Sequence, residues 1–272
     1  MGREEKQMAG VDRGTVGVMA ESSKLHMGYA EETCFTIGKR IAADVPVILP
    51  VGAVEAHGPH LPLETDNLLA ARYARRLAAL VNGLVLPTLP FGQVFSLGDF
   101  PGSLSLSNET LTRIVVELGE GLYRQGVRIF VLFSAHLGNL TALKEGAREL
   151  WARHRDMCTL HMFYPDLQKL AANVRESPAA HVSYIHACEI ETSLMLYLAP
   201  EHVDMAKALA EDPKLPIDAD YTPTPWSEFT QTAVLGNARL ATEEKGRYLI
   251  EETLKRAAAI VEYEKERVRS VS

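Results

Sequence analysis

Cysteine is scarce in this sequence of 272 residues, which holds Cys34, Cys158 and Cys188 and no CxxC pair. An odd and widely spaced set of this kind excludes a disulfide framework. Long apolar runs are also missing, and because a membrane-spanning helix needs about 20 apolar residues in a row, we expect no membrane partner. Basic residues are too few for a nucleic-acid partner, since 28 Lys and Arg stand against 35 Asp and Glu.

The first 24 residues show little apolar pattern. We predict that residues 1–24 form an N-terminal extension that is mobile or contacts another subunit, followed by a single domain at residues 25–272. The start is charged and lacks the hydrophobic segment of a secretory signal, so a cytoplasmic protein is expected. Apolar residues make up 47% and charged residues 23%, as in ordinary soluble proteins.

Short apolar runs alternate with longer segments of helical periodicity. The runs predict strands at Val45–Val51, Leu84–Leu86, Val127–Phe133 and Cys158–Phe163. Helices are predicted at Asn67–Leu80, Ser107–Gln125, Leu140–His154, Glu189–Leu198 and Thr242–Val268, the first capped by Asp66 or Asn67. This alternation predicts an α/β fold with a mostly parallel sheet between helices. The Pro- and Asp-rich segment Glu211–Trp226 is predicted to be irregular: a surface loop, a lid or a subunit contact.

Polar residues gather directly after the first predicted strand. The segment Glu55–Asp66 (EAHGPHLPLETD) holds three carboxylates and two imidazoles. Burying these charges without partners would be costly, and divalent cations could partner most of them at once. Glu55 and His57 are two residues apart and would face the same side of an extended chain, while the two oxygens of Asp66 can bridge two cations. Imidazole and carboxylate suit zinc, manganese or iron better than calcium.

A histidine follows another predicted strand. His136 comes directly after Val127–Phe133, the clearest strand pattern in the chain. The carboxyl ends of parallel strands meet at one edge of a sheet, where such folds bind their ligands. We therefore expect His136 to lie in the same crevice as Glu55 and His57.

A third polar group stands where a helix is predicted to begin. It consists of His186, Glu189 and Glu191. On a helix two residues apart diverge, so only one of the two glutamates would reach a cation, whereas in an extended chain before the helix both could. Carboxylates at this position also interact with the helix dipole without any further role.

At these motifs the sequence resembles the creatininase (creatinine amidohydrolase) family. The matching segments are PVGAVEAHGPHLPLETD at Pro50–Asp66, FPGSLSLSNETL at Phe100–Leu111, HLGN at His136–Asn139 and HACEIETS at His186–Ser193. The resemblance covers about residues 45–198. It implies a three-layer α/β/α sandwich, a dinuclear metal centre holding two divalent ions (Zn, Mn or Fe) per chain, and a homo-oligomer, with a hexamer as one form.

The resemblance also implies a ligand set. Glu55 and His136 would bind one ion, His57 the other, and Asp66 would bridge them. Glu191 is the expected last ligand of the second ion, because the family's creatininase has its carboxylate ligand at the position that is glycine 138 here.

Roles in catalysis follow from the same resemblance. His186 matches the family's catalytic histidine, and Glu191 is expected to act beside it. Leu137 and Glu189 are expected to contact the substrate, a small molecule. The implied reaction is metal-assisted hydrolysis of a C–N bond in a small amide, formamide or cyclic amide other than creatinine, with His186 passing a proton to the leaving nitrogen. Two alternatives remain: hydrolysis of a keto-sugar-like or peptide substrate, and a non-catalytic metal- or ligand-binding protein on the same fold.

Overall fold

Four parallel strands form the central sheet in the computed structural model, which describes residues 28–271. They are β1 (Val47–Val51), β2 (Leu84–Val85), β3 (Ile129–Ser134) and β4 (Cys158–Met162), in the order β2-β1-β3-β4. A small antiparallel pair joins β5 (Ala210–Glu211) to β6 (Gly236–Asn237). Every residue of β1 and β3 is buried, as expected for strands covered on both faces. The predicted α/β fold with a mostly parallel sheet is confirmed.

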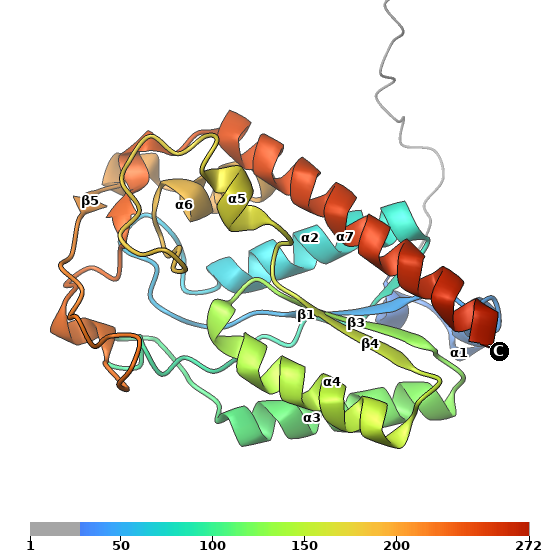
Figure 1. Ribbon diagram of the computed structural model, residues 1–272. Coiled ribbons are helices and arrows are strands. Elements are labelled where there is room, and N and C mark those ends of the chain that lie inside the picture. Colours follow the sequence, from blue (N-terminus) through green and yellow to red (C-terminus); the bar gives the residue numbers. More distant parts are fainter. Residues whose placement is uncertain (1–27, 272) are drawn as a thin grey trace, which may run out of the picture.

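Helices cover both faces of this sheet (Figure 1). The helices are α1 (Cys34–Ile41), α2 (Thr65–Val81), α3 (Asn108–Arg124), α4 (Leu140–Arg153), α5 (Leu167–Ala171), α6 (Glu189–Leu198) and α7 (Glu243–Val271). One apolar cluster joins the sheet to α2, α5, α6 and α7, and a second joins its other face to α3 and α4. These are the three layers that the family resemblance implies.

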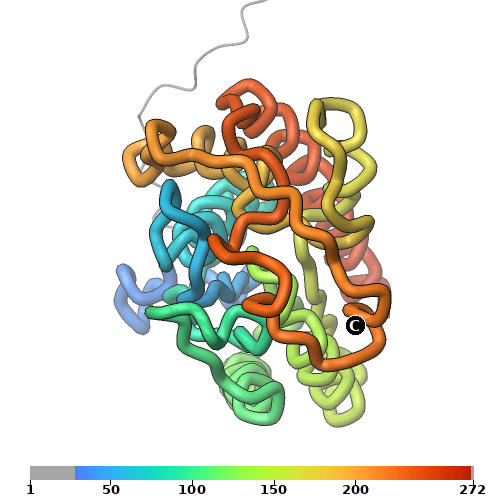
Figure 2. Tube along the Cα trace, turned by 90° about the vertical axis from the view of Figure 1, so that its left-hand side faces the viewer, coloured from blue at the N-terminus to red at the C-terminus, as the bar shows by residue number. Residues whose placement is uncertain are grey.

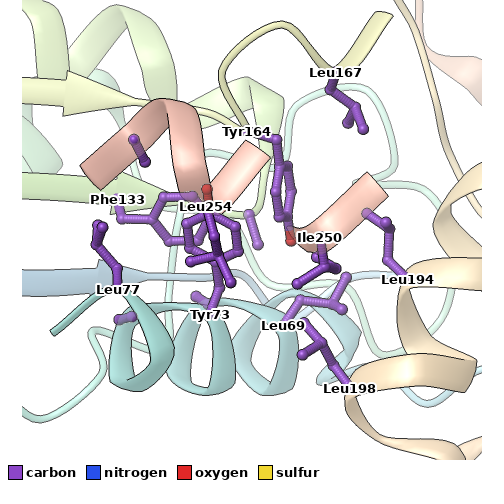
Figure 3. Packing of buried hydrophobic residues seen from close by; sticks show 14 of the residues in the cluster. Leu69, Tyr73, Leu77, Phe133, Tyr164, Leu167, Leu194, Leu198, Ile250 and Leu254 are labelled. Carbon is purple, nitrogen blue, oxygen red and sulfur yellow. The ribbon is translucent and has the colours of Figure 1, made fainter. Parts of the chain in front are cut away.

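Aromatic side chains fill the layer between α2 and the sheet (Figure 3). Tyr73 of α2 stacks on Phe133 of β3 with ring centroids 4.1 Å apart, and Tyr164 meets Phe133 edge-on at 5.2 Å. Leu69 and Leu77 lie four residues to either side of Tyr73, on the same face of the helix. This packing fixes the first turn of α2 beside the carboxyl end of β1.

The start of α2 differs from the prediction. Neither Asp66 nor Asn67 caps the helix, which begins at Thr65 after Glu64. The Thr65 N–H and hydroxyl both donate to the carbonyl of Pro62, so a tight turn leads directly into the helix. Asp66 is therefore free of a capping role and stands in the buried first turn.

Figure 2 views the molecule from the side where the strands end. Residues 211–226, orange in that view, contain no long helix or strand, as predicted, and the short 3-10 turn Trp226–Glu228 closes them. Helices α1 and α5 were not predicted. The extension expected at residues 1–24 lies outside the described residues. Within residues 28–271 no helix is both long and apolar enough to cross a membrane.

Candidate metal centre and active site

Side chains with metal-binding chemistry meet beyond the carboxyl ends of β1 and β3. The loop after β1 supplies two of them, the first turn of α2 one, the loop after β3 one, and the segment entering α6 two: Glu55, His57, Asp66, His136, His186 and Glu191. Nδ1 of His136 lies 3.0 Å from Oε1 of Glu55. The two strand-end loops therefore converge as the sequence predicted.

Asp66 belongs to two groups of candidate ligands. In the first, Nδ1 of His136 lies 3.5 Å from one Asp66 oxygen and 3.0 Å from Glu55. In the second, Nε2 of His57 lies 3.7 Å from the other Asp66 oxygen and 3.6 Å from Oε2 of Glu191. One carboxylate thus offers one oxygen to each group, which is the geometry of a bridging ligand.

The three histidine rings are oriented by backbone carbonyls. Nδ1 of His57 faces the carbonyl of Glu55 at 3.1 Å, and Nε2 of His136 faces that of Gln93 at 2.7 Å. Nε2 of His186 faces the carbonyl of Ala56 at 2.8 Å. A carbonyl can only accept, so each of these nitrogens carries a proton, and the other nitrogen of each ring faces the carboxylates. Histidines that bind metals are commonly held in this way.

The charges of this cluster fit divalent cations. Burial raises the pKa of Asp66 well above its usual range, and the carboxylate of Glu55 adds to the effect. Burial also raises the pKa of Glu191. Nε2 of His57 and Oδ2 of Asp66 are buried without a hydrogen-bond partner. Imidazole nitrogens and carboxylate oxygens suit zinc, manganese or iron, and a cation in each ligand group would partner one of these two atoms.

A strained residue sets the direction of the segment that enters α6. Ala187 has φ +47°, in the left-handed region that costs a non-glycine residue about 1–2 kcal/mol. In this conformation its N–H donates to Oε2 of Glu191 at 2.5 Å. The same backbone course places His186 beside His57, with ring centroids 4.3 Å apart.

Asn139 joins three loops that surround the cluster. No sequence pattern singled it out. It is fully buried, and its amide donates to the carbonyl of Gly52 at 2.9 Å and to the hydroxyl of Ser134 at 3.1 Å. Its side-chain oxygen accepts from the N–H of Gln93 at 2.9 Å. Because the carbonyl of Gln93 holds His136, Asn139 positions that histidine through one intermediate residue.

Gly138 is surrounded too closely to carry a side chain. A Cβ there would lie 2.4 Å from Nε2 of His136 and 2.6 Å from the carbonyl oxygen of Gln93, the two atoms whose hydrogen bond orients the ring. We predict that Gly138→Ala lowers metal affinity about 10–100-fold, the usual effect of disturbing a group that holds a ligand. Titration of the metal-free variant with Zn²⁺ or Mn²⁺ measures this.

A matched control is available on α3. Gly121→Ala would place its Cβ no closer than 3.9 Å to another group, and alanine favours a helix. This variant is expected to bind metal like the unchanged protein. Equal metal affinity in Gly138→Ala and Gly121→Ala would show that the contact with His136 and Gln93 is unimportant.

Glu189, expected to contact the substrate, does not line the cavity beside the cluster. Its side chain is fully buried and accepts from the N–H groups of Glu176 and Ser177, from the Ser177 hydroxyl, and from Nζ of Lys245 at 2.6 Å. Glu189 thus ties the loop before His186 to α7. Glu191, two positions along the helix, points the other way into the cluster.

This tie gives a stability prediction. Lys245→Met removes the cation that pairs with buried Glu189. The side chain of Lys245 is itself only 11% exposed. Breaking such a pair leaves an unbalanced buried charge, so we expect the free energy of unfolding to fall by about 3 kcal/mol in a urea titration. The control is Lys255→Met on the same helix, whose 69% exposed side chain pairs with exposed Glu252. The unfolding midpoint of Lys255→Met should equal that of the unchanged protein. Equal midpoints for Lys245→Met and Lys255→Met would show that the Lys245–Glu189 pair does not stabilise the fold.

A cavity of about 210 Å³ opens onto the cluster. Its walls include the predicted substrate-contacting residue Leu137, together with Gln93, Val94, Ser96, Leu97, Phe163, Tyr184, Ile185 and Trp226. His60, from the first motif, lies elsewhere: its Nε2 is 2.8 Å from the hydroxyl of Thr192. Trp226 and Gln93 are wall residues that sequence analysis did not find, because neither follows a strand or stands in a motif.

Comparison with known proteins identifies the relatives of this site. The family model described as "Creatininase: Creatinine amidohydrolase" matches residues 30–261. This chain belongs to the creatininase family. Creatinine amidohydrolase of Pseudomonas putida is 34% identical over 233 residues, which cover 78% of this chain and 87% of that protein.

Other similar proteins are named for different substrates. A mycofactocin precursor peptide peptidase of Mycolicibacterium smegmatis is 29% identical and covers 65% of this chain and 68% of its own length. A 3-dehydro-scyllo-inosose hydrolase of Thermotoga maritima is 26% identical and covers 62% of this chain and 55% of its own. This chain is thus a creatininase-family hydrolase whose relatives act on different substrates.

Solved creatininase structures share the fold. One described as creatinine amidohydrolase has a TM-score of 0.81 at 29% identity and covers 88% of this chain and 97% of its own. A manganese form and a mutant creatininase of the zinc–zinc type each have a TM-score of 0.80 at 28% identity, and each match covers 88% of this chain and 98% of the other. A divalent metal therefore belongs to this family's site.

Proposed function

We propose that this protein is a dinuclear metal-dependent amidohydrolase that cleaves a C–N bond in a small amide, formamide or cyclic amide. The observation that carries the proposal is the pair of ligand groups that share Asp66. In this proposal Glu55 and His136 complete one site with Asp66, and His57 and Glu191 complete the other. Two divalent ions there would polarise a substrate carbonyl and lower the pKa of a water molecule to near neutral.

His186 is proposed to carry the proton. Its Nε2 is committed to the carbonyl of Ala56, so Nδ1 is the atom that can take and give a proton. Nδ1 lies 3.6 Å from Oε1 of Glu55 and 3.9 Å from Oε2 of Glu191, at the edge of the cavity that a substrate would occupy. A leaving nitrogen bound there would receive its proton from this atom. Leu137 is proposed to contact the substrate, since it lines the same cavity.

The size of the cavity favours a small substrate. About 210 Å³ is below the range of pockets that hold drug-sized ligands, roughly 300–1,000 Å³. A folded peptide would not fit, although an extended peptide end would. Creatinine is not the expected substrate, because glycine at 138 cannot supply a carboxylate and no side chain fits there.

The proposal is tested by metal analysis combined with hydrolysis assays. After purification in Zn²⁺ or Mn²⁺ and removal of free metal, we expect two ions per chain and hydrolysis of at least one member of a panel. The panel contains cyclic amides, formamides, linear amides, short peptides and a keto-sugar derivative. Two ions with hydrolysis of only the peptide or sugar compounds would reject the amide assignment. Two ions without any hydrolysis would favour a metal- or ligand-binding protein, and no ions would reject the proposal altogether.

A further inference from the structure

The cavity beside the cluster has an unusual balance of charge. Apart from the candidate ligands and His186, its walls are neutral, and within residues 28–271 no lysine or arginine lines it. Its polar wall groups are Gln93, Ser96 and Tyr184, and the remaining wall side chains are apolar. A substrate carboxylate or phosphate away from the metal ions would therefore lose its hydration without gaining a cationic partner, which is costly.

Trp226 lines the same cavity as the candidate metal ligands. Its ring meets His186 edge-on, with centroids 5.3 Å apart and planes at 79°. Its centroid also lies 5.6 Å from that of Tyr184, and Trp226 packs against the small buried cluster that contains Val94 and Leu97. The indole therefore borders the proposed proton carrier and the apolar side of the cavity at once.

Trp226 lies in an irregular segment, residues 212–229, whose two ends are joined to each other by hydrogen bonds. Glu211 accepts hydrogen bonds from the Thr230 hydroxyl at 2.8 Å and from the N–H of Gln231 at 2.9 Å, which closes the base of the loop. Near the far end, Asp220 accepts from the Tyr184 hydroxyl at 2.5 Å and lies 2.9 Å from Nε2 of His181.

The neighbourhood of Trp226 itself is also fixed. Its backbone N–H donates to the carbonyl of Ser96 at 2.7 Å, and the adjacent Ser227 hydroxyl donates to Asp99 at 2.6 Å. These two hydrogen bonds thus hold the backbone at Trp226 and Ser227 against the 94–99 loop. A wall held in this way keeps a defined shape, as a specificity pocket requires.

We propose that Trp226 selects the substrate: the site takes uncharged amides with a planar apolar substituent, which packs on the indole, and rejects analogues that carry a second charge. The inference rests on the proposed amidohydrolase function. It assigns substrate selection to a residue in the 212–229 segment, outside the metal-binding motifs. Aromatic contacts of this kind strengthen binding by up to about tenfold beyond the effect of burial, which is enough to rank similar substrates.

The sequence offers a direct optical test, because it contains two tryptophans. The other, Trp151, is exposed on α4 and does not line the cavity. The variant Trp151→Phe leaves Trp226 as the sole tryptophan without touching the loop. We expect its fluorescence to change saturably with benzamide, in metal-free and metal-replete protein alike. The charged analogue 4-carbamoylbenzoate should bind at least about tenfold more weakly.

Two replacements complete the test by calorimetry. Trp226→Ala is expected to weaken benzamide binding about tenfold and to leave acetamide, which has no ring, unchanged, while Trp226→Phe keeps most of the benzamide affinity. Equal binding of benzamide and 4-carbamoylbenzoate, or unchanged benzamide affinity in Trp226→Ala, would overturn the inference. So would the absence of any saturable benzamide binding.

The proposed hydrolase function and the proposed role of Trp226 can be tested separately. If the protein holds two metal ions and cleaves an amide of the panel but does not distinguish the two benzamides, only the role of Trp226 is wrong. If it binds benzamide at Trp226 but holds no metal, the proposed function is wrong and the selective cavity remains.

Discussion

Replacing Asp66 with alanine is expected to remove both metal ions and abolish hydrolysis. Its two oxygens face the two ligand groups separately, so the change takes a ligand from each. Loss of a direct ligand should exceed the effect of disturbing a supporting group, so we expect kcat/KM to fall by more than about 100-fold. Metal content by elemental analysis and kcat/KM for the best panel amide are the measurements.

The isosteric change Asp66→Asn separates ligand loss from misfolding. The amide keeps the shape of the side chain and one oxygen, so at most one ion should remain. In metal-free protein Asp66→Asn should unfold no earlier than the unchanged chain, because it removes an acidic group from a buried cluster of three carboxylates.

Glu266, exposed on α7, provides the control for losing a carboxylate. Glu266→Ala is expected to keep both ions and full activity. Two ions and undiminished activity in Asp66→Ala would exclude the bridging role, and the site would then depend on Glu55, His57 and Glu191.

Sequence patterns located the cluster because its members lie just after strands or at the starts of helices. The apolar runs that became β1 and β3 are buried on both faces, and parallel strands bring their ends together. The helix predicted at Glu189–Leu198 has the observed bounds of α6. The sequence also predicted that Glu189 and Glu191 point in different directions from the helix. It did not predict which of the two faces the cluster. Lys245, distant in sequence, holds Glu189 on the other side.

The residues that position the ligands and line the cavity were not predicted, because their contacts are with residues distant in the sequence. Asn139 bonds to Gly52 and positions Gln93, and no local pattern marks such a contact. Trp226 stands in a Pro-rich segment whose sequence predicts only irregular structure. The cap expected at Asp66 failed for a related reason: a turn at Pro62 begins the helix earlier and leaves the carboxylate for the cluster.

His186→Ala is expected to separate metal binding from chemistry. If Nδ1 carries the proton to the leaving nitrogen, both ions should stay bound and kcat should fall by about 10²–10⁴-fold, the usual effect of losing a general acid or base. KM should change less, since the ring is not proposed to hold the ground-state carbonyl. Steady-state kinetics with metal analysis on the same preparation gives all three values.

His202→Ala is the matched control, because this histidine is exposed and lies outside the ligand groups and the cavity wall. It should retain kcat. Loss of an ion in His186→Ala would instead make His186 a ligand, in the group it can form with Glu55 and His57. An unchanged kcat would leave His186 only a structural role beside Trp226. The proton would then have to come from another group, and Glu55 and Glu191, the two carboxylates beside Nδ1 that line the cavity, would be the first to test.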